Sequence, residues 1–268
     1  MGIERLAAIE SARLVLREPI KYGGLVAGLY LLSLKDKKLG TAIRTSYLFL
    51  RHIDDYLDEG SGNRDEKLPY VLKLREEIEL GQFDGGMGDL AKCSLQILAN
   101  NAGPDDNPKQ DFLTAIDAMV FDYQRSKERR VLSRQELDEY YHDTFFSVVN
   151  LTLIGFNSQF RASDIPELSY GQGRVFSVRD LDEDWQRGVI NIPKEILWEA
   201  NLNQYSKIAE VRSSAIIREW LISELSQSRE GLIAVKIKLD QSGEKLTSRL
   251  CNGVTKTASQ LLRRYNAC

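Results

Sequence analysis

Apolar residues recur with the 3.6-residue spacing of an α-helix along almost the whole chain, and this pattern constrains the fold more than any other feature. The chain has six prolines, so few stretches are barred from helix, and short breaks separate the periodic segments. The spacing predicts helices over residues 3–16, 22–34, 39–59, 65–80, 87–101, 109–127, 134–156, 167–187, 204–226 and 229–265, the last broken near residues 242–243. The breaks are expected at residues 60–63, 81–88, 103–108 and 191–193. We therefore predict an all-α protein that forms one domain over residues 1–268, as a helical bundle with a central cavity.

One segment also suits a different structure. Residues 232–239 (LIAVKIKL) alternate apolar and polar side chains as a β-strand would. An apolar run from Leu25 to Leu34 is too short to span a bilayer. We expect a buried helix there; the alternative is a helix that lies on a membrane surface. The N-terminus has no signal-peptide pattern.

Composition narrows the classes of function. The net charge is −3 with both signs mixed throughout, which gives no basic stripe for a nucleic acid. Two histidines and three scattered cysteines are too few for a zinc cluster and suggest no disulfide framework. No glycine-rich dinucleotide fingerprint appears, so NADPH is not indicated. We expect a soluble cytoplasmic protein with peripheral membrane contact as an option.

Two pairs of aspartates stand out, Asp54 with Asp58 and Asp180 with Asp184. Each pair is spaced i,i+4, which places both carboxylates on one face of a helix. The first pair lies in a segment that is apolar nearly all round and should be buried. Buried carboxylates need a metal or a counter-charge. The alternative for this pair is a solvated acidic helix end at residues 58–62.

The residues around the second pair are expected to form a packed face beside the acidic one. Leu181 and Trp185 would form this packed face, with Glu183 and Arg187 as an ordinary surface pair. Arg51 and Arg179 precede the two aspartate pairs. They are candidates to bind phosphate oxygens, or else to neutralise the neighbouring carboxylates. Asp122 is a lone acid in an apolar stretch, with a helix-surface position as its alternative.

These residue types point to magnesium and a diphosphate. Mg²⁺ takes carboxylate, water and phosphate oxygens as ligands, and two opposed pairs could clamp two or three ions around a diphosphate leaving group. Ionisation of an allylic diphosphate leaves a carbocation, which needs a dry cavity with aromatic faces. Ordinary core packing is the alternative for each aromatic candidate. The candidates are Tyr47, Phe121, Tyr123, Tyr140, Tyr141, Phe145, Phe146 and Phe176.

Residues 47–59 (YLFLRHIDDYLDE) resemble the first aspartate-rich motif of the squalene/phytoene synthase family, and residues 179–193 (RDLDEDWQRGVINIP) are similar to its second. Residues 118–122 and 137–141 resemble the middle segment. The resemblance implies an isoprenoid-synthase fold and head-to-head joining of two prenyl diphosphates of ten to twenty carbons. Carried over by matched position, the residues have three implied roles. Asp54, Asp58, Asp180 and Asp184 would bind Mg²⁺, Arg51 and Arg179 would bind the diphosphate, and Tyr47 would lie near the reacting carbons. Apart from these matched positions, we also predict that Arg187 binds the diphosphate and that the cavity is lined by Asp122, Tyr141, Phe145 and Phe176.

The sequence departs from the family pattern at three places. Residues 24–28 (GLVAG) stand where the family usually has a Ser-Phe segment, and Gly173 and Phe176 where it usually has Gln and Asn. Residues 145–150 (FFSVVN) replace small residues. These changes favour a second hypothesis, a terpene cyclase or prenyltransferase that uses one prenyl diphosphate. A third is a non-catalytic relative that acts in assembly or lipid binding.

Overall fold

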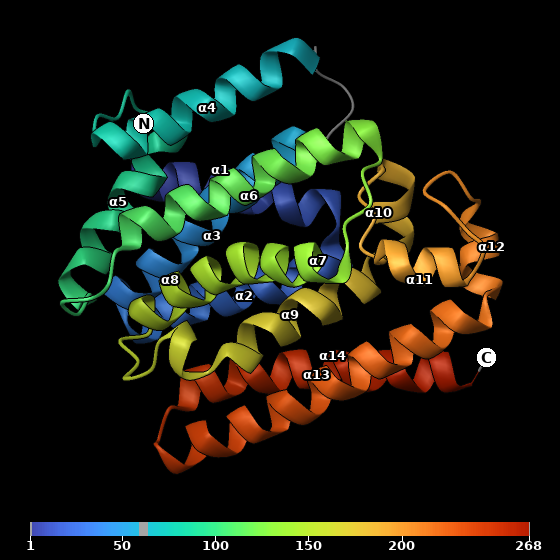
Figure 1. Cartoon of the computed structure of the whole chain (residues 1–268). Helices are drawn as coiled ribbons and strands as arrows, with labels where there is room; N and C mark the ends of the chain where they lie inside the picture. Colours follow the sequence, from blue (N-terminus) through green and yellow to red (C-terminus); the bar gives the residue numbers. More distant parts are fainter. Residues whose placement is uncertain (1, 59–63, 268) are drawn as a thin grey trace. The chain divides into compact units, whose positions relative to one another are not determined.

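The structure is a computed structural model that describes residues 2–58 and 64–267 (Figure 1). These residues fold into helices, as predicted, and their β-type pairing is confined to an isolated bridge between Val131 and Ile190. The helices of the first half are α1 (Ile3–Arg17), α2 (Pro19–Lys35), α3 (Lys37–Asp58), α4 (Arg64–Leu80), α5 (Met87–Asn101), α6 (Pro108–Glu128), α7 (Arg134–Tyr141) and α8 (Ser147–Gly155). The second half contains α9 (Pro166–Arg179), α10 (Leu181–Arg187), α11 (Lys194–Glu199), α12 (Ile208–Ser213), α13 (Ala215–Gln241) and α14 (Lys245–Asn266). A π-helical turn, η1 (His142–Phe146), joins α7 to α8, and a 3₁₀ turn, η2 (Ala162–Asp164), precedes α9.

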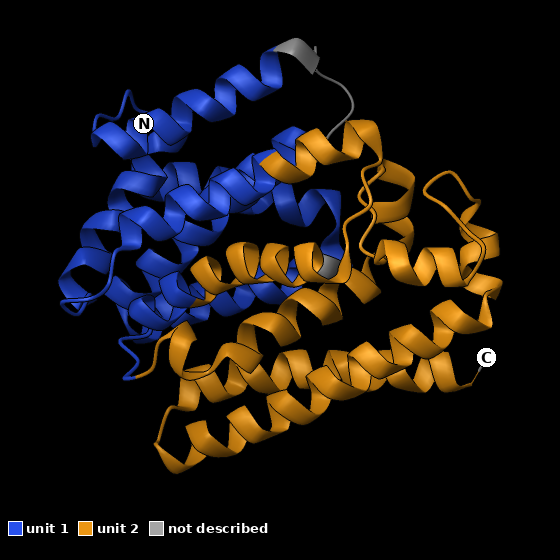
Figure 2. Cartoon of the chain, viewed as in Figure 1, with its two compact units in different colours: residues 1–120, 150–159 blue, residues 121–149, 160–268 orange. Residues whose placement is uncertain are grey.

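The helices form two compact units (Figure 2). The first unit contains residues 1–120 and 150–159, and the second contains residues 121–149 and 160–268. Helices α6 and α8 therefore contribute to both. The first aspartate pair belongs to the first unit and the second pair to the second unit. The expectation of a single domain over residues 1–268 stays a prediction.

The first unit is built around α3, which packs against α2 and α5. Phe49 of α3 is fully buried and meets the ring of Phe112 edge-on, with 5.8 Å between the ring centroids. Helix α3 is amphipathic. Its buried set includes Ile53 and Leu57, while Asp54 is half-buried and Asp58, its last residue, is exposed.

Helix α2 is buried on one side only, so the expectation of a buried helix at residues 25–34 is wrong for its other side. Tyr22, Val26 and Leu29, at i, i+4 and i+7, face the unit's core. On the opposite side Ile20 is 99% exposed, and the apolar side chains there continue along the helix. Leu31 and Leu34 are exposed on the same side as Ile20, whereas Leu25 is exposed next to the buried side.

The second unit is organised by α9, which packs against α13, α14 and the π-helical turn. The alternating segment 232–239 is helical within α13, because Leu232, Val235 and Leu239 are spaced to bury one helix face. The predicted break near residues 242–243 is confirmed, with α13 ending at Gln241 and Gly243 at a φ of 75°.

Several helix limits differ from the prediction. The predicted helix 134–156 is interrupted by the π-helical turn, and the predicted helix 167–187 is broken at Asp180, whose φ of −97° and ψ of 9° are not helical. No break separates residues 226 and 229, since α13 runs through them from its N-cap Ser214. Helix α11 follows Pro193 and was not predicted. The predicted break at residues 60–63 lies outside the described residues.

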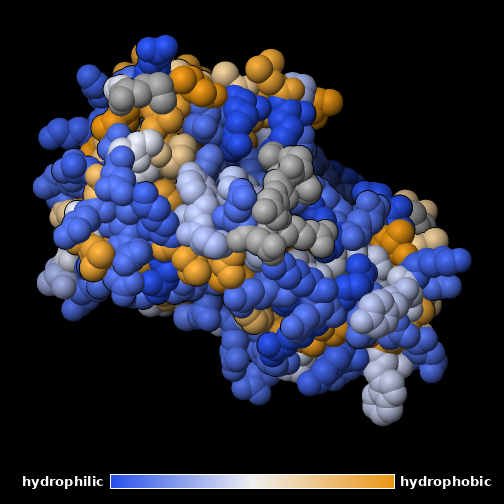
Figure 3. Space-filling view, turned by 90° about the horizontal axis from the view of Figure 1, so that it is seen from above, coloured by the Kyte–Doolittle hydropathy of each residue, from blue (hydrophilic) through white to orange (hydrophobic). Residues whose placement is uncertain are grey.

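The surface drawn in Figure 3 is mainly hydrophilic, with hydrophobic residues in separate groups. No helix in the described parts of the chain has the length and apolar composition that crossing a bilayer requires.

Candidate functional site

The first aspartate pair lies in the last two turns of α3, and an arginine already engages it. Arg51 Nη1 lies 2.6 Å from Asp54 Oδ2, and Arg51 Nη2 lies 2.5 Å from Asp55 Oδ1. Burial works to lower the pKa of Arg51, but the charges of Asp54 and Asp55 raise it well above its usual value, so the guanidinium keeps its charge. Two roles were expected for Arg51, binding phosphate or neutralising the neighbouring carboxylates. In this structure it neutralises the carboxylates.

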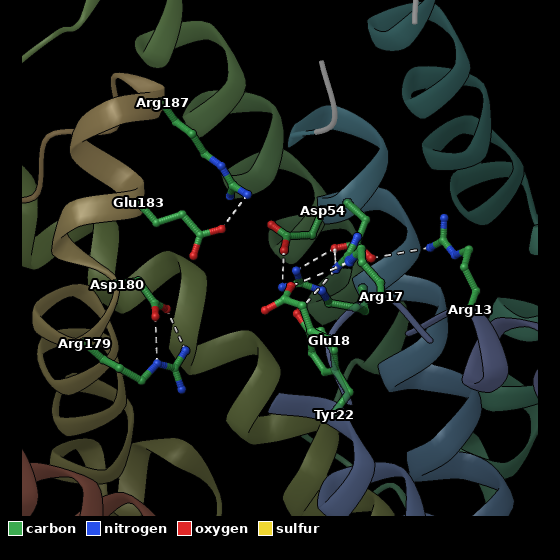
Figure 4. A network of polar contacts seen from close by, with 11 residues as sticks. Arg13, Arg17, Glu18, Tyr22, Asp54, Arg179, Asp180, Glu183 and Arg187 are labelled. Carbon is green, nitrogen blue, oxygen red and sulfur yellow. Dashed lines mark hydrogen bonds and ion pairs between the residues drawn. The ribbon is translucent and has the colours of Figure 1, made fainter. Parts of the chain in front are cut away.

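Asp55 is the acid at this site that sequence reasoning missed. Its side chain is 1% exposed and receives three guanidinium groups: Arg51, Arg17 at 2.8 Å and Arg13 at 3.5 Å. A buried carboxylate with this many charged donors is compensated for the loss of water. Arg13 and Arg17 are one helical turn apart in α1, and this spacing was the available signal for a buried acid opposite them. Figure 4 shows Arg13, Arg17 and Asp54 gathered around this network.

Tyr47 lies one turn before Arg51 in α3 and is half-buried. Burial raises the pKa of its phenol well above the usual value, while the charge of Arg51 works against that rise. The charges of Asp55 and Asp54 also work to raise this pKa. Tyr47 is therefore a neutral hydroxyl beside the first aspartate motif.

The second pair spans the junction of α9 and α10. Although Asp180 is not helical, the backbone N–H of Asp184 donates to the Asp180 carbonyl at 2.9 Å, so the two residues remain one turn apart. Arg179 donates to both carboxylate oxygens of Asp180, at 2.8 and 2.6 Å, and Arg187 pairs with Glu183 at 2.6 Å (Figure 4). The expected surface pair of Glu183 and Arg187 is thus confirmed.

The packed face of the second motif is also confirmed. Leu181 and Trp185 are both buried, and Trp185 Nε1 donates to the Ser206 carbonyl at 3.0 Å. Gly188 ends α10 with a φ of 93°, a conformation that favours glycine, and an added Cβ would collide with the Ser126 carbonyl. The chain then turns back, so that Ile190 pairs with Val131 in the isolated bridge.

Asp184 is held by a chain of polar side chains, of which Asn191 and Arg125 are buried. Asn191 Nδ2 donates to Asp184 Oδ2 at 3.1 Å, and Asn191 Oδ1 accepts from Arg125 Nη2 at 2.6 Å. Arg125 also donates from Nη1 to the Ile190 carbonyl at 3.1 Å and from Nε to Asp122 Oδ1 at 2.6 Å. Tyr140 completes the chain by donating to Asp122 Oδ2 at 2.5 Å.

This network changes the interpretation of Asp122 and adds two residues that were not predicted. Asp122 is not a lone acid, because Arg125 and Tyr140 occupy its two oxygens. Arg125 is 2% exposed, and although burial works to lower its pKa, the Asp122 charge raises it. The i,i+3 spacing of Asp122 and Arg125 was the sequence signal for this pair. Nothing in the sequence linked either residue to Asn191.

Gly173 and Phe176 occupy the positions where the family pattern differs, and the structure explains both. A Cβ at Gly173 would stand 2.8 Å from Tyr141 Cδ1 and 3.0 Å from Phe145 Cδ2, so two rings fill the space of a side chain there. The Phe145 and Phe176 rings are 6.3 Å apart, and the Arg179 guanidinium lies 4.4 Å from the centroid of Phe176. An aromatic surface thus replaces amide groups beside the second motif.

Of the remaining aromatic candidates, two pack against the core of the second unit and two make contacts elsewhere. Phe121 and Tyr140 pack on the buried cluster of Leu132, Leu137 and Tyr141. Phe146 stacks on His142 at 4.6 Å, and Lys127 lies over Tyr123 at 4.1 Å.

The donor chemistry suits a magnesium site that is shared with a substrate. Each pair offers carboxylate oxygens one helical turn apart, the ligand type that Mg²⁺ prefers. Among the described residues, neither unit gathers three or more His, Cys, Asp or Glu side chains into a metal-binding group. A pair alone therefore leaves most of an octahedral shell to water and phosphate oxygens, as is usual for Mg²⁺.

Comparison with known proteins agrees with this geometry. No curated protein sequence matches the chain. The squalene/phytoene synthase family matches residues 29–264, which include both aspartate pairs and the buried network around Arg125. This match supports a prenyl-diphosphate synthase-like function of the head-to-head type. The chain belongs to the squalene/phytoene synthase family.

Proposed function

We propose that the protein is a Mg²⁺-dependent prenyltransferase that ionises allylic prenyl diphosphates of ten to twenty carbons and joins two of them head to head. The observation that carries this proposal is the pairing of arginine with aspartate in both motifs, Arg51 with Asp54 and Arg179 with Asp180. Carboxylates for a cation stand beside guanidinium groups for an anion, and a metal diphosphate presents both charges.

In this proposal each residue type has a distinct task. Asp54, Asp58, Asp180 and Asp184 would hold Mg²⁺, which when bound neutralises the charge that develops on the diphosphate. Arg51 and Arg179 would turn from their carboxylates to phosphate oxygens, because a guanidinium fork fits either group. Arg187 would join them from the Glu183 pair.

The carbon chain needs a different environment. The Tyr141, Phe145 and Phe176 rings would exclude water, and their faces would stabilise the allylic cation. Tyr47 would present a neutral hydroxyl near the reacting carbons, in keeping with its raised pKa.

Two features favour a second candidate function, a terpene cyclase or prenyltransferase that uses a single prenyl diphosphate. The space beside Gly173 is filled by Tyr141 and Phe145, and Phe176 offers no hydrogen bond to a phosphate. Both features reduce the polar groups available for a second diphosphate.

One experiment decides between the two candidates and tests both. Purified protein is incubated with Mg²⁺ and geranyl, farnesyl or geranylgeranyl diphosphate, and released pyrophosphate and product masses are measured. Head-to-head joining predicts a hydrocarbon with twice the carbons of its substrate. A product with the carbon count of one substrate, or an alkylated acceptor, would support the second candidate. Release of no pyrophosphate from any substrate would contradict both and favour a non-catalytic relative.

We also propose that the first unit rests on a membrane surface through the exposed side of α2, and that the protein works in the cytoplasm. Ile20, Leu31 and Leu34 are 99%, 65% and 83% exposed, at i, i+11 and i+14 on one helix face. No Asp or Glu lies between Pro19 and Lys35, and the three exposed lysines at the end of the helix, Lys35, Lys37 and Lys38, outnumber the one exposed acid among them, Asp36. Apolar side chains bordered by lysines suit an anionic bilayer, from which a prenyl diphosphate would also be drawn.

Replacing Leu31 and Leu34 together by Ser is expected to weaken binding to phosphatidylcholine vesicles that contain phosphatidylglycerol by at least about tenfold, because two apolar side chains no longer enter the lipid. Vesicle flotation measures the bound fraction. The matched control is Leu72→Ser with Leu80→Ser, a pair of exposed leucines on α4 that should leave binding unchanged. Light scattering tests the alternative that the exposed side of α2 binds a second copy of the chain instead of a membrane. Unchanged vesicle binding, or a dimer that only the α2 variant loses, would contradict the membrane proposal.

A further inference from the structure

A network of polar side chains in the second unit, centred on the buried Arg125 and Asn191, ends on a carboxylate. Its members are Tyr140, Asp122, Arg125 and Asn191, and the carboxylate is that of Asp184. Four hydrogen bonds of 2.5 to 3.1 Å link these five side chains in series.

Arg125 has the geometry of an anchor. Its three guanidinium nitrogens donate to three different groups, those of Asp122, Ile190 and Asn191, so the planar fork fixes their relative positions. The ring of Tyr140 lies 4.6 Å from its central carbon, which adds a cation–π contact. At 2% exposure, the guanidinium has little water to compete for these donors.

Asn191 connects Arg125 to Asp184. Its carbonyl oxygen accepts from Arg125, which leaves the amide nitrogen directed at Asp184 Oδ2. Arg125 thus determines which way the amide points, because a flipped amide would oppose donor to donor. Asn191 is itself buried, with its backbone held beside Ile190 of the bridge to Val131.

We propose that Asn191 and Arg125 are positioning residues that hold the Asp184 carboxylate in the orientation in which it would bind Mg²⁺. The inference rests on the proposed function, since it assigns Asp184 to the metal. Hydrogen bonds of this kind orient a ligand before the ion arrives, and their loss typically lowers metal affinity by about 10- to 100-fold.

The test measures Mg²⁺ binding to the full chain by calorimetry in the presence of a non-hydrolysable farnesyl thiodiphosphate. Asn191→Leu keeps the branched outline of the side chain, at a larger volume, and removes the amide. It should raise the Kd for Mg²⁺ by about 10- to 100-fold and raise the Mg²⁺ concentration that half-saturates turnover. Asn203→Leu is the matched control in the same unit, because the Asn203 side chain accepts from the Tyr205 backbone N–H and has no link to Asp184. It should leave the Kd unchanged.

Two further variants distinguish a positioning role from a general loss of folding and from a failure of the metal assignment. If Asn191→Leu does not fold, Asn191→Ser replaces it, since a serine can hydrogen-bond but is too short to reach from Arg125 to Asp184. An unchanged Kd in the folded variant overturns the inference, even if the melting temperature falls. If Asp184→Asn also leaves the Kd unchanged, the proposed function fails as well. If Asp184→Asn weakens Mg²⁺ binding and the Asn191 variants do not, only the positioning role fails.

Discussion

An Asp184→Asn variant is expected to lose about 100-fold or more in turnover while its helical fold and melting temperature stay close to those of the wild type. The substitution keeps the shape of the side chain and an oxygen that Asn191 Nδ2 can reach at about the same place, but it removes the charge that Mg²⁺ requires. Pyrophosphate release at saturating substrate, followed as a function of Mg²⁺ concentration, measures the effect.

The matched control lies in the same helix. Asp182 is 41% exposed and pairs with Arg212, so it is an acid of α10 without a role in the proposed site. Asp182→Asn should change stability by less than about 0.5 kcal/mol and leave turnover as it was. Equal effects of the two substitutions would mean that the second motif is only a solvated acidic turn.

Arg125→Leu is expected to lower the free energy of unfolding by about 3–5 kcal/mol. The leucine leaves the Asn191 and Ile190 carbonyls without their donor in a buried place, and such groups are costly. The half-buried Asp122 also loses its charged partner. Chemical denaturation followed by circular dichroism gives the change in the free energy of unfolding.

Arg75→Leu provides the comparison for a surface pair. Arg75 binds both oxygens of Asp117, at 2.6 and 3.0 Å, but half of the Asp117 side chain is exposed to solvent. Water can replace the lost donor there, and the expected loss is about 1 kcal/mol or less. Similar losses for the two arginine variants would show that burial of Arg125 contributes little.

Local patterns predicted the helices and much of the site. The all-α fold follows from apolar periodicity, which also placed Leu181 and Trp185 on the packed side of the second motif. The same periodicity over-extended one helix. The break falls at Asp180, which is neither Gly nor Pro, so no residue type there signals that the helix ends.

Partners that are distant in the sequence could not be predicted in this way. Asp55 is buried because arginines from α1 reach it, and Arg125 is buried because Asn191, 66 residues away, accepts from it. Periodicity tells which face of a helix is apolar, but not which charges meet across a core. For α2 the error was opposite, since an apolar sequence alone does not tell which of its sides has a partner.

The crowding around Gly173 limits how this sequence can change. Any larger residue at that position meets the rings of Tyr141 and Phe145 first, so an amide cannot be introduced there by one substitution without displacing them. Both rings would have to give way beforehand, and an intermediate with a smaller residue at either place would carry a void in its aromatic surface. Reaching the pattern with Gln at this position is therefore an ordered, multi-step path whose first step is unfavourable.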